Sequence, residues 1–228
     1  MVCEQQREES WTFVSLKRES FDNSRDDALE IFRGSADMVS EILNLRCLYV
    51  EDHNSNVSRL AVEIGRELNL DRLSIAIVEM AGKMHDTGMF SLYADLISKP
   101  GPLKSFEMEL VKEHPIVGAN ITKTVPFPAG VTRAILEHHE RLDGSGYPSG
   151  IEEPVISLEG RVLAVAEVVS AMSFFRPYRE LHGVEYALDE IRKYSGILYD
   201  REVVKACFRA FEMGFDFKES RSNRKSLR

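Results

Sequence analysis

Long apolar runs are missing from this chain of 228 residues, and so are the sequence signals of export. No stretch approaches the roughly 20 consecutive apolar residues that a membrane-spanning helix needs. The first ten residues lack the charged start and following apolar segment of a signal peptide. These absences predict a cytoplasmic protein with no membrane insertion.

Cysteine and positive charge are also scarce. The cysteines Cys3, Cys47 and Cys207 share no metal-binding or redox spacing, which agrees with a reduced compartment. Lys and Arg number 29 against 37 Asp and Glu, so the formal net charge is −8. A chain this acidic is not expected to bind nucleic acid. Only residues 215–228 are locally basic, and we expect them to form a polar tail.

Apolar residues recur at helical spacing along most of the chain, which predicts an all-α bundle. Residues 29–214 are expected to form one domain behind an N-terminal extension, residues 1–28. Asp71 and Ser105 are predicted to cap helices, and Pro115 fits a first helical turn. The apolar stretch 158–172 contains many β-branched residues, but its length favours a buried helix. The other helices are expected from Asp27 to about Leu48, after His53, up to Gly88, and around 131–138, 184–194 and 203–211.

The most informative stretch is HHERLDGSGYP, residues 138–148. The run before it is helical in pattern, whereas Gly144, Gly146 and Pro148 cannot continue a helix. His138 and His139 therefore lie at the end of a helix, beside a stiff loop. Neighbouring helical residues point about 100° apart, so this pair can reach two points of one site, for example two metal ions.

The other histidines of the chain strengthen this interpretation. Most of them lie near the end of an expected helix, and His85 is followed directly by Asp86. Glu167 lies inside a very apolar helix, where a carboxylate is costly to bury unless it is paired or binds a metal. Imidazoles and carboxylates without thiolates suit Fe, Mn, Zn or Ni. Two such ions close together form a phosphodiester hydrolase site.

These motifs resemble the HD-GYP domain, a branch of the HD phosphohydrolase superfamily, over roughly residues 30–212. The segments that carry the resemblance are HNSNVSRLA from His53, HDTG from His85, KPG from Lys99, EHPIVGANI from Glu113, HHERLDGSGYP from His138 and RPYR from Arg176. The resemblance implies an all-α HD-domain bundle with a metal site between helices.

The resemblance also implies an activity, the metal-dependent hydrolysis of a cyclic dinucleotide by a metal-bridging hydroxide. Cyclic di-GMP, cleaved to linear pGpG or GMP, is the first expectation, and cyclic GMP-AMP is the second. Two divalent transition-metal ions are implied, with Fe or Mn ahead of Zn or Ni. A diguanylate cyclase or another signalling protein is a possible partner at the GYP loop.

Matching the motifs residue by residue assigns roles to positions of this sequence. Asp86 and His85 are the expected catalytic pair, with Asp86 bridging the metals. Arg176 and Arg179 are expected to bind the phosphate or guanine of the substrate. Gly146, Tyr147 and Pro148 form the motif loop, where Tyr147 is expected to act as scaffolding and not as a catalyst. The implied metal ligands are His53, His85, Asp86, His114, His138, His139 and Glu167.

The sequence departs from the HD-GYP pattern at three informative positions. Met89 stands where the pattern has a Lys that faces the scissile phosphate. Glu167 replaces the usual Asp ligand, and Ser170 replaces a second Asp. The position of a third-metal ligand is Tyr49, which favours two metals.

These departures keep two alternatives open. One is a weakly active or inactive HD-GYP-like sensor or interaction module. The other is an HD phosphohydrolase that acts on a different nucleotide.

Overall fold

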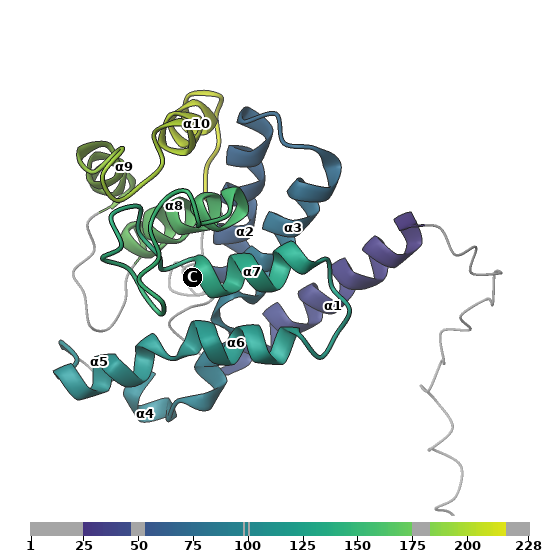
Figure 1. Ribbon diagram of the computed structural model, residues 1–228, viewed down its shortest axis with the longest axis vertical. Coiled ribbons are helices and arrows are strands. Elements are labelled where there is room, and N and C mark those ends of the chain that lie inside the picture. The colour runs from purple at the N-terminus through teal and green to yellow at the C-terminus, as the bar shows by residue number, and fades with distance from the viewer. Residues whose placement is uncertain (1–24, 47–52, 98, 100, 175–182, 218–228) are drawn as a thin grey trace, which may run out of the picture.

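The computed structural model describes residues 25–46, 53–97, 99, 101–174 and 183–217. In these ranges the chain is helical, and its only extended pairs are two isolated bridges, Asp143–Glu152 and Ser195–Tyr199. This agrees with the predicted all-α fold (Figure 1). The elements in order are α1 (Arg25–Arg46), α2 (His53–Glu67), α3 (Arg72–Met84), the 3₁₀ helix η1 (His85–Ser91), α4 (Ala94–Ile97), α5 (Ser105–Lys112), α6 (His114–Thr122), α7 (Ala129–Glu137), α8 (Leu158–Ser173), α9 (Gly183–Lys193) and α10 (Arg201–Glu212).

Helix α8 lies at the centre of the bundle and packs against α2, α7 and α9 (Figure 1). Most of its apolar side chains are buried, and Val162, Leu163, Val165 and Val169 are fully so. The stretch 158–172 is thus a buried helix, as predicted, and its β-branched residues fill the core. Because α8 is enclosed on several sides, a polar residue on it must face either a polar partner or an internal site.

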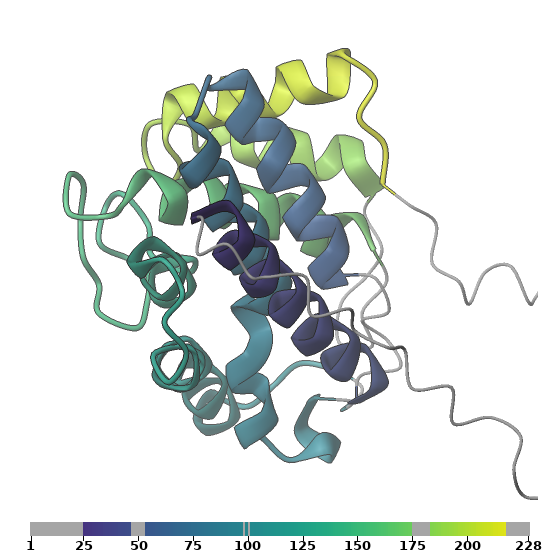
Figure 2. The ribbon, with the colours of Figure 1, turned by 90° about the vertical axis from the view of Figure 1, so that its right-hand side faces the viewer.

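Helices α2 and α3 form an antiparallel pair beside α8, and α1 lies obliquely across the outside of α3 (Figure 2). On α2, Val57, Leu60, Ala61 and Ile64 are buried. Asp71 caps α3, as predicted, by accepting a hydrogen bond from the Ser74 N–H at 2.8 Å. On α1, Ala36 and Leu43 are buried, whereas Ile42 is exposed.

The chain between α3 and α6 differs from the sequence-based expectation. The helix that was expected to reach Gly88 is α3, and it ends at Met84. The chain then continues past Gly88 as the 3₁₀ helix η1. The short helix α4 follows η1. Ser105 opens α5 and does not cap it, because the Glu107 carboxylate accepts the Lys104 N–H at 2.6 Å. Pro115 lies in the first turn of α6, as predicted.

Within the described ranges, no helix combines the length and the apolar character that crossing a bilayer requires.

Candidate metal centre

The predicted histidine ligands lie at helix ends that meet inside the bundle. His53 is the first residue of α2, His85 the first of η1, and His114 the first of α6. His138 caps the C-terminus of α7, and His139 follows it. Glu167 reaches the same region from the middle of α8. The structure thus brings together side chains that are up to 114 residues apart in the sequence, as the 2.8 Å contact between His53 and Glu167 shows.

One group of potential ligands consists of His53, His85 and Asp86, whose donor atoms lie within 4.8 Å of one another. Glu167 adjoins this group: its Oε2 lies 2.8 Å from His53 Nε2 and 3.7 Å from His85 Nε2. The Asp86 Oδ2 lies 3.5 Å from His85 Nε2. His53, His85 and Glu167 are buried, so these polar atoms face one another in a largely water-free environment.

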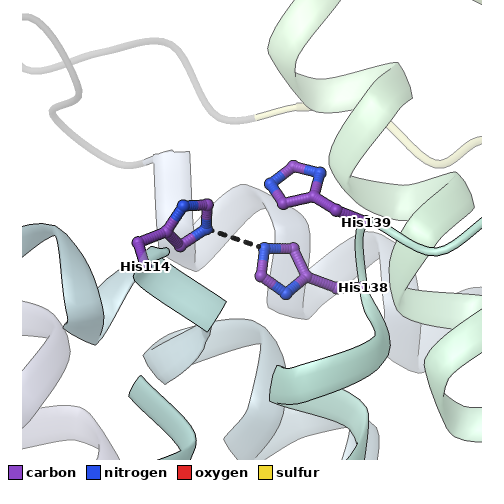
Figure 3. Close-up of side chains that lie close together, drawn as sticks. All are labelled: His114, His138 and His139. Carbon is purple, nitrogen blue, oxygen red and sulfur yellow. Dashed lines mark hydrogen bonds between the residues drawn. The ribbon is translucent and has the colours of Figure 1, made fainter. Parts of the chain in front are cut away.

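A second group consists of His114, His138 and His139, also within 4.8 Å (Figure 3). The Nε2 atoms of His114 and His138 are 3.2 Å apart. Asp86 connects the two groups, because its Oδ1 lies 3.7 Å from His114 Nε2. Both members of the adjacent histidine pair face this one group. The expectation that neighbouring residues diverge fails here, since His139 lies beyond the last residue of α7 and its ring turns back beside His138.

Main-chain carbonyls fix the orientation of three of these imidazoles. The Nδ1 atoms of His85, His114 and His138 lie 2.9, 2.7 and 2.6 Å from the carbonyl oxygens of the residues three positions earlier, Gly82, Val111 and Ile135. A carbonyl only accepts, so each Nδ1 carries the proton. Each Nε2 therefore presents a lone pair toward the centre of the site, as a metal-binding histidine must.

Burial keeps the imidazoles of the second group neutral. Loss of hydration lowers the pKa of His114, and it lowers the pKa values of His138 and His139 well below the ordinary imidazole value. The neighbouring imidazoles lower the last two further. A neutral imidazole with a free Nε2 lone pair is the form that binds a metal.

These features fit a divalent transition-metal ion. In neutral rings with Nδ1 protonated, the His114 and His138 Nε2 atoms are two acceptors at 3.2 Å, and a cation bound to both satisfies them. The His85 Nε2 is buried and makes no hydrogen bond within the described residues. Imidazole nitrogens and carboxylate oxygens without thiolates suit Fe, Mn, Zn or Ni.

The GYP loop packs directly against the second group. The Tyr147 ring stacks on His139, with centroids 4.5 Å apart and planes at 25°, and the Tyr147 N–H donates to the His139 carbonyl at 3.1 Å. A side chain at Gly146 would meet backbone atoms of His139, Glu140 and Arg141 at 2.5 Å. The Tyr147–Pro148 peptide bond is cis. The loop thus packs against both the ring and the backbone of His139.

Two supporting residues had no role in the motif analysis. The buried Glu140 carboxylate accepts the N–H groups of Ser149 and Ile151 at 2.8 and 3.2 Å, which ties the loop to the histidine pair. The Ser170 Oγ lies 3.0 Å from His53 Nδ1. The sequence contained a signal for the contact between Ser170 and His53: Ser170 follows Glu167 by three residues on α8, and residues at this spacing share a helix face.

Three positions of the sequence analysis cannot be compared with the structure. Arg176, Arg179 and Tyr49 lie outside the described residues. Met89, where the HD-GYP pattern has a Lys, is half-buried on η1 three residues after Asp86.

Comparison with known proteins places the chain in a family. Residues 37–203 match the HD domain family. A cyclic di-GMP phosphodiesterase of Thermotoga maritima is 36% identical over 174 residues, covering 74% of this chain and 47% of that protein. The cyclic di-GMP phosphodiesterase response regulator RpfG of Xanthomonas campestris pv. campestris is 36% identical over 156 residues, covering 67% and 41%. The chain thus spans less than half the length of these two relatives.

A solved structure shares the fold. The protein Bd1817 of Bdellovibrio bacteriovorus, described as an HDG"Y"P protein, superposes with a TM-score of 0.62 at 16% identity, covering 82% of this chain and 66% of that one. The helical fold, the family match and the motifs at His53, His85, His114 and His138 agree with one another. The chain belongs to the HD domain family, in its HD-GYP branch.

Proposed function

We propose that this protein is a metal-dependent phosphodiesterase that hydrolyses a cyclic dinucleotide, with cyclic di-GMP as the first candidate and linear pGpG or GMP as the product. The observation that carries the proposal is the continuous cluster of five imidazoles and two carboxylates, in which at least three Nε2 lone pairs face a common centre. The names of the two curated relatives support the choice of substrate.

The cluster divides into two sets of ligands that suit two divalent ions. His53, His85 and Glu167 would hold one ion, and His114, His138 and His139 the other. Asp86 lies between the sets and has an oxygen toward each, which suits a bridging ligand. Two ions in one site activate water as a nucleophile and stabilise the charge that develops on phosphorus. Fe or Mn remains the first expectation for their identity.

The protein's own residues supply position and a low dielectric. Burial of His85, His114 and His138 excludes water around the ligands, so electrostatic interactions with the substrate phosphate are stronger there than in solvent. The stack of Tyr147 on His139 limits the movement of that ring. Arg176 and Arg179 stay the predicted contacts for the phosphate or guanine.

Chromatography of reaction products tests the proposal. Protein loaded anaerobically with Fe(II) or Mn(II) is incubated with cyclic di-GMP, cyclic GMP-AMP and a panel of other phosphoesters. We expect pGpG or GMP from the first substrate, and no product from the His138→Ala variant. Intact cyclic dinucleotides with both proteins, in samples whose metal content is verified, would refute the proposal.

Met89 favours a second candidate function, a sensor or interaction module that binds a nucleotide with little or no turnover. A thioether cannot donate a hydrogen bond to a phosphate oxygen, and the loss of one such donor costs about 10²–10³ in rate. This candidate predicts nucleotide binding by calorimetry without product. A single good substrate outside the cyclic dinucleotides would instead identify a different HD phosphohydrolase.

The remaining assignments complete the proposal. We infer a cytoplasmic protein whose residues 29–214 form the catalytic domain, preceded by the extension 1–28 and followed by the basic tail 215–228. A diguanylate cyclase that docks at the GYP loop is the protein partner we propose.

A further inference from the structure

Helix α1 exposes large apolar side chains along the face that points away from the bundle. It lies on the outside of α3, and Ala36 and Leu43 are buried on its inner side (Figure 2). The opposite side carries four apolar residues whose exposed fractions lie between 46% and 82%. A monomeric protein rarely exposes a large continuous apolar patch unless the patch is an interaction surface. These four residues, which we call the α1 stripe, are Ile31, Met38, Ile42 and Leu45.

Ion pairs fix the rotation of α1 about its own axis. The Arg33 Nε lies 3.0 Å from Glu79 Oε2, and the Lys83 Nζ lies 2.7 Å from Asp37 Oδ1. Glu79 and Lys83 both belong to α3, so the two pairs join one side of α1 to that helix. A rotation that turned the α1 stripe inward would break both pairs and would expose Ala36, which is fully buried. The outward direction of the stripe is therefore a property of the fold.

The α1 stripe has the spacing of a coiled coil. Ile31, Met38 and Leu45 follow one another at intervals of seven residues. Ile42 comes four residues after Met38 and three before Leu45. These are the d and a positions of a heptad repeat, at which each apolar side chain packs between side chains of a second helix. Ser35, a small residue, occupies the a position before Ile42. The pattern predicts that the partner of the stripe is another helix.

We propose that this partner is α1 of a second copy of the chain. A heptad stripe can pair with its own copy, because the apolar side chains of one helix fill the gaps between those of the other. Each copy contributes one helix of 22 residues, about 33 Å long and about 10 Å wide. This strip is smaller than the roughly 800 Å² per partner of a standard stable interface. We therefore expect a weak dimer, with a dissociation constant on the order of micromolar.

The charges beside the α1 stripe select a parallel arrangement of the two helices. One flank of the stripe carries the acidic residues Glu30, Asp37 and Glu41. The other flank carries Ala28 and Val39. In an antiparallel pair the acidic flanks of the two copies would face each other, which is unfavourable for like charges. In a parallel pair each acidic flank faces the uncharged flank of the other copy.

Sedimentation velocity of the full chain at increasing concentration tests the proposal. We expect a shift from monomer to dimer over the micromolar range. Met38→Glu places like charges against each other in the middle of the interface and should raise the dissociation constant at least about 10-fold. Met38 is 60% exposed in the single copy, so this variant should fold. Met213→Glu is the matched control, because Met213 is 80% exposed at the end of α10, and its dimer should be unchanged.

Two results of the sedimentation experiment would contradict the proposal. A chain that stays monomeric at every concentration would overturn it and would indicate that a segment of the same chain covers the α1 stripe. A dimer that Met38→Glu does not weaken would place the interface on another surface. Neither result depends on the metal centre or on the proposed activity.

Disulfide cross-linking tests the parallel arrangement. Ser35→Cys is introduced into a chain that carries Cys3→Ser and Cys47→Ser, and the remaining Cys207 is buried. In a parallel pair the two new thiols face each other, so mild oxidation should give a covalent dimer. In an antiparallel pair centred on Met38 they would lie about 9 Å apart along the helix axis, too far for a disulfide. A dimer in sedimentation that forms no cross-link would overturn the parallel arrangement.

Discussion

Replacing Gly88 with Ala should disturb the metal centre without changing any ligand. A Cβ at residue 88 would overlap the His114 carbonyl oxygen and lie 2.7 Å from the His114 carbonyl carbon and 2.8 Å from the Gly118 nitrogen. All three are backbone atoms, so no side-chain rotation relieves the overlap. Helix α6 and η1 must instead separate, by about 1 Å or more, and a displacement of this size costs about 10²-fold in rate at a reacting site.

The same overlap predicts a loss of stability. Overpacking costs about 1–3 kcal/mol. For a chain of this size that corresponds to a Tm lower by about 2–12 °C. The displacement also changes the contacts of His114 with Asp86 and His138, which are 3.7 and 3.2 Å in the wild-type protein. Metal affinity should therefore fall together with Tm.

Gly34→Ala is the matched control for this substitution. Gly34 lies within α1, and a Cβ there would meet nothing within 4 Å. Ala in a helix interior is more stable than Gly by about 0.5–1 kcal/mol, so this variant should gain Tm and keep its metal. Thermal unfolding, metal titration and product chromatography are measured on both variants. A Gly88→Ala protein with wild-type Tm, metal affinity and rate would refute the packing argument.

Three further predictions concern other residues. Met89→Lys should raise the rate of cyclic di-GMP hydrolysis by up to about 10²–10³-fold if the Lys ammonium reaches the phosphate. Mass spectrometry should show the same metal content as in the wild-type protein. An unchanged rate would show that the missing Lys does not limit hydrolysis. The metal-free protein should lose stability as pH falls from 7.5 to 5.5. Folding lowers the pKa values of His114, His138 and His139, so below about pH 6.5 the unfolded chain takes up protons that the folded chain does not. A Tm that stays constant over this range, measured in chelator, would contradict this prediction. Burial raises the pKa of Cys207 to about 12, so iodoacetamide at pH 8 should label this thiol in the unfolded chain but not in the native one, as peptide mapping would reveal.

Local sequence patterns were sufficient to predict most of the helices. The N-cap at Asp71 depends on one carboxylate and the next turn, and the burial of α8 follows from its many apolar residues. The start of α5 was less predictable, because Ser105 is a good capping residue by type while the observed contact uses Glu107. Several side chains near such a position can cap the helix, and tertiary packing selects the one that does.

The resemblance to the HD-GYP motifs implied a set of candidate ligands, but it did not give their arrangement in space. His138 and His139 are adjacent, and only the fold of the GYP loop, with Tyr147 stacked on His139, turns both rings toward the same group. The 3₁₀ geometry of η1 brings Gly88 against the His114 backbone, a contact between segments that the sequence pattern does not relate. Ser170 was noted as a missing acid, and its contact with His53 depends on how α8 packs against α2.

The most direct test of the account is the rate of pGpG formation as a function of Mn(II) bound per chain. Metal-free protein is titrated anaerobically with Mn(II), and bound metal and product are measured in the same samples. Because Asp86 connects two groups of ligands, we expect little product at one equivalent of Mn(II) per chain and full activity near two equivalents. The His138→Ala variant should neither bind Mn(II) tightly nor form product. Hydrolysis that survives complete removal of the metal, or that is unaffected by His138→Ala, would contradict it.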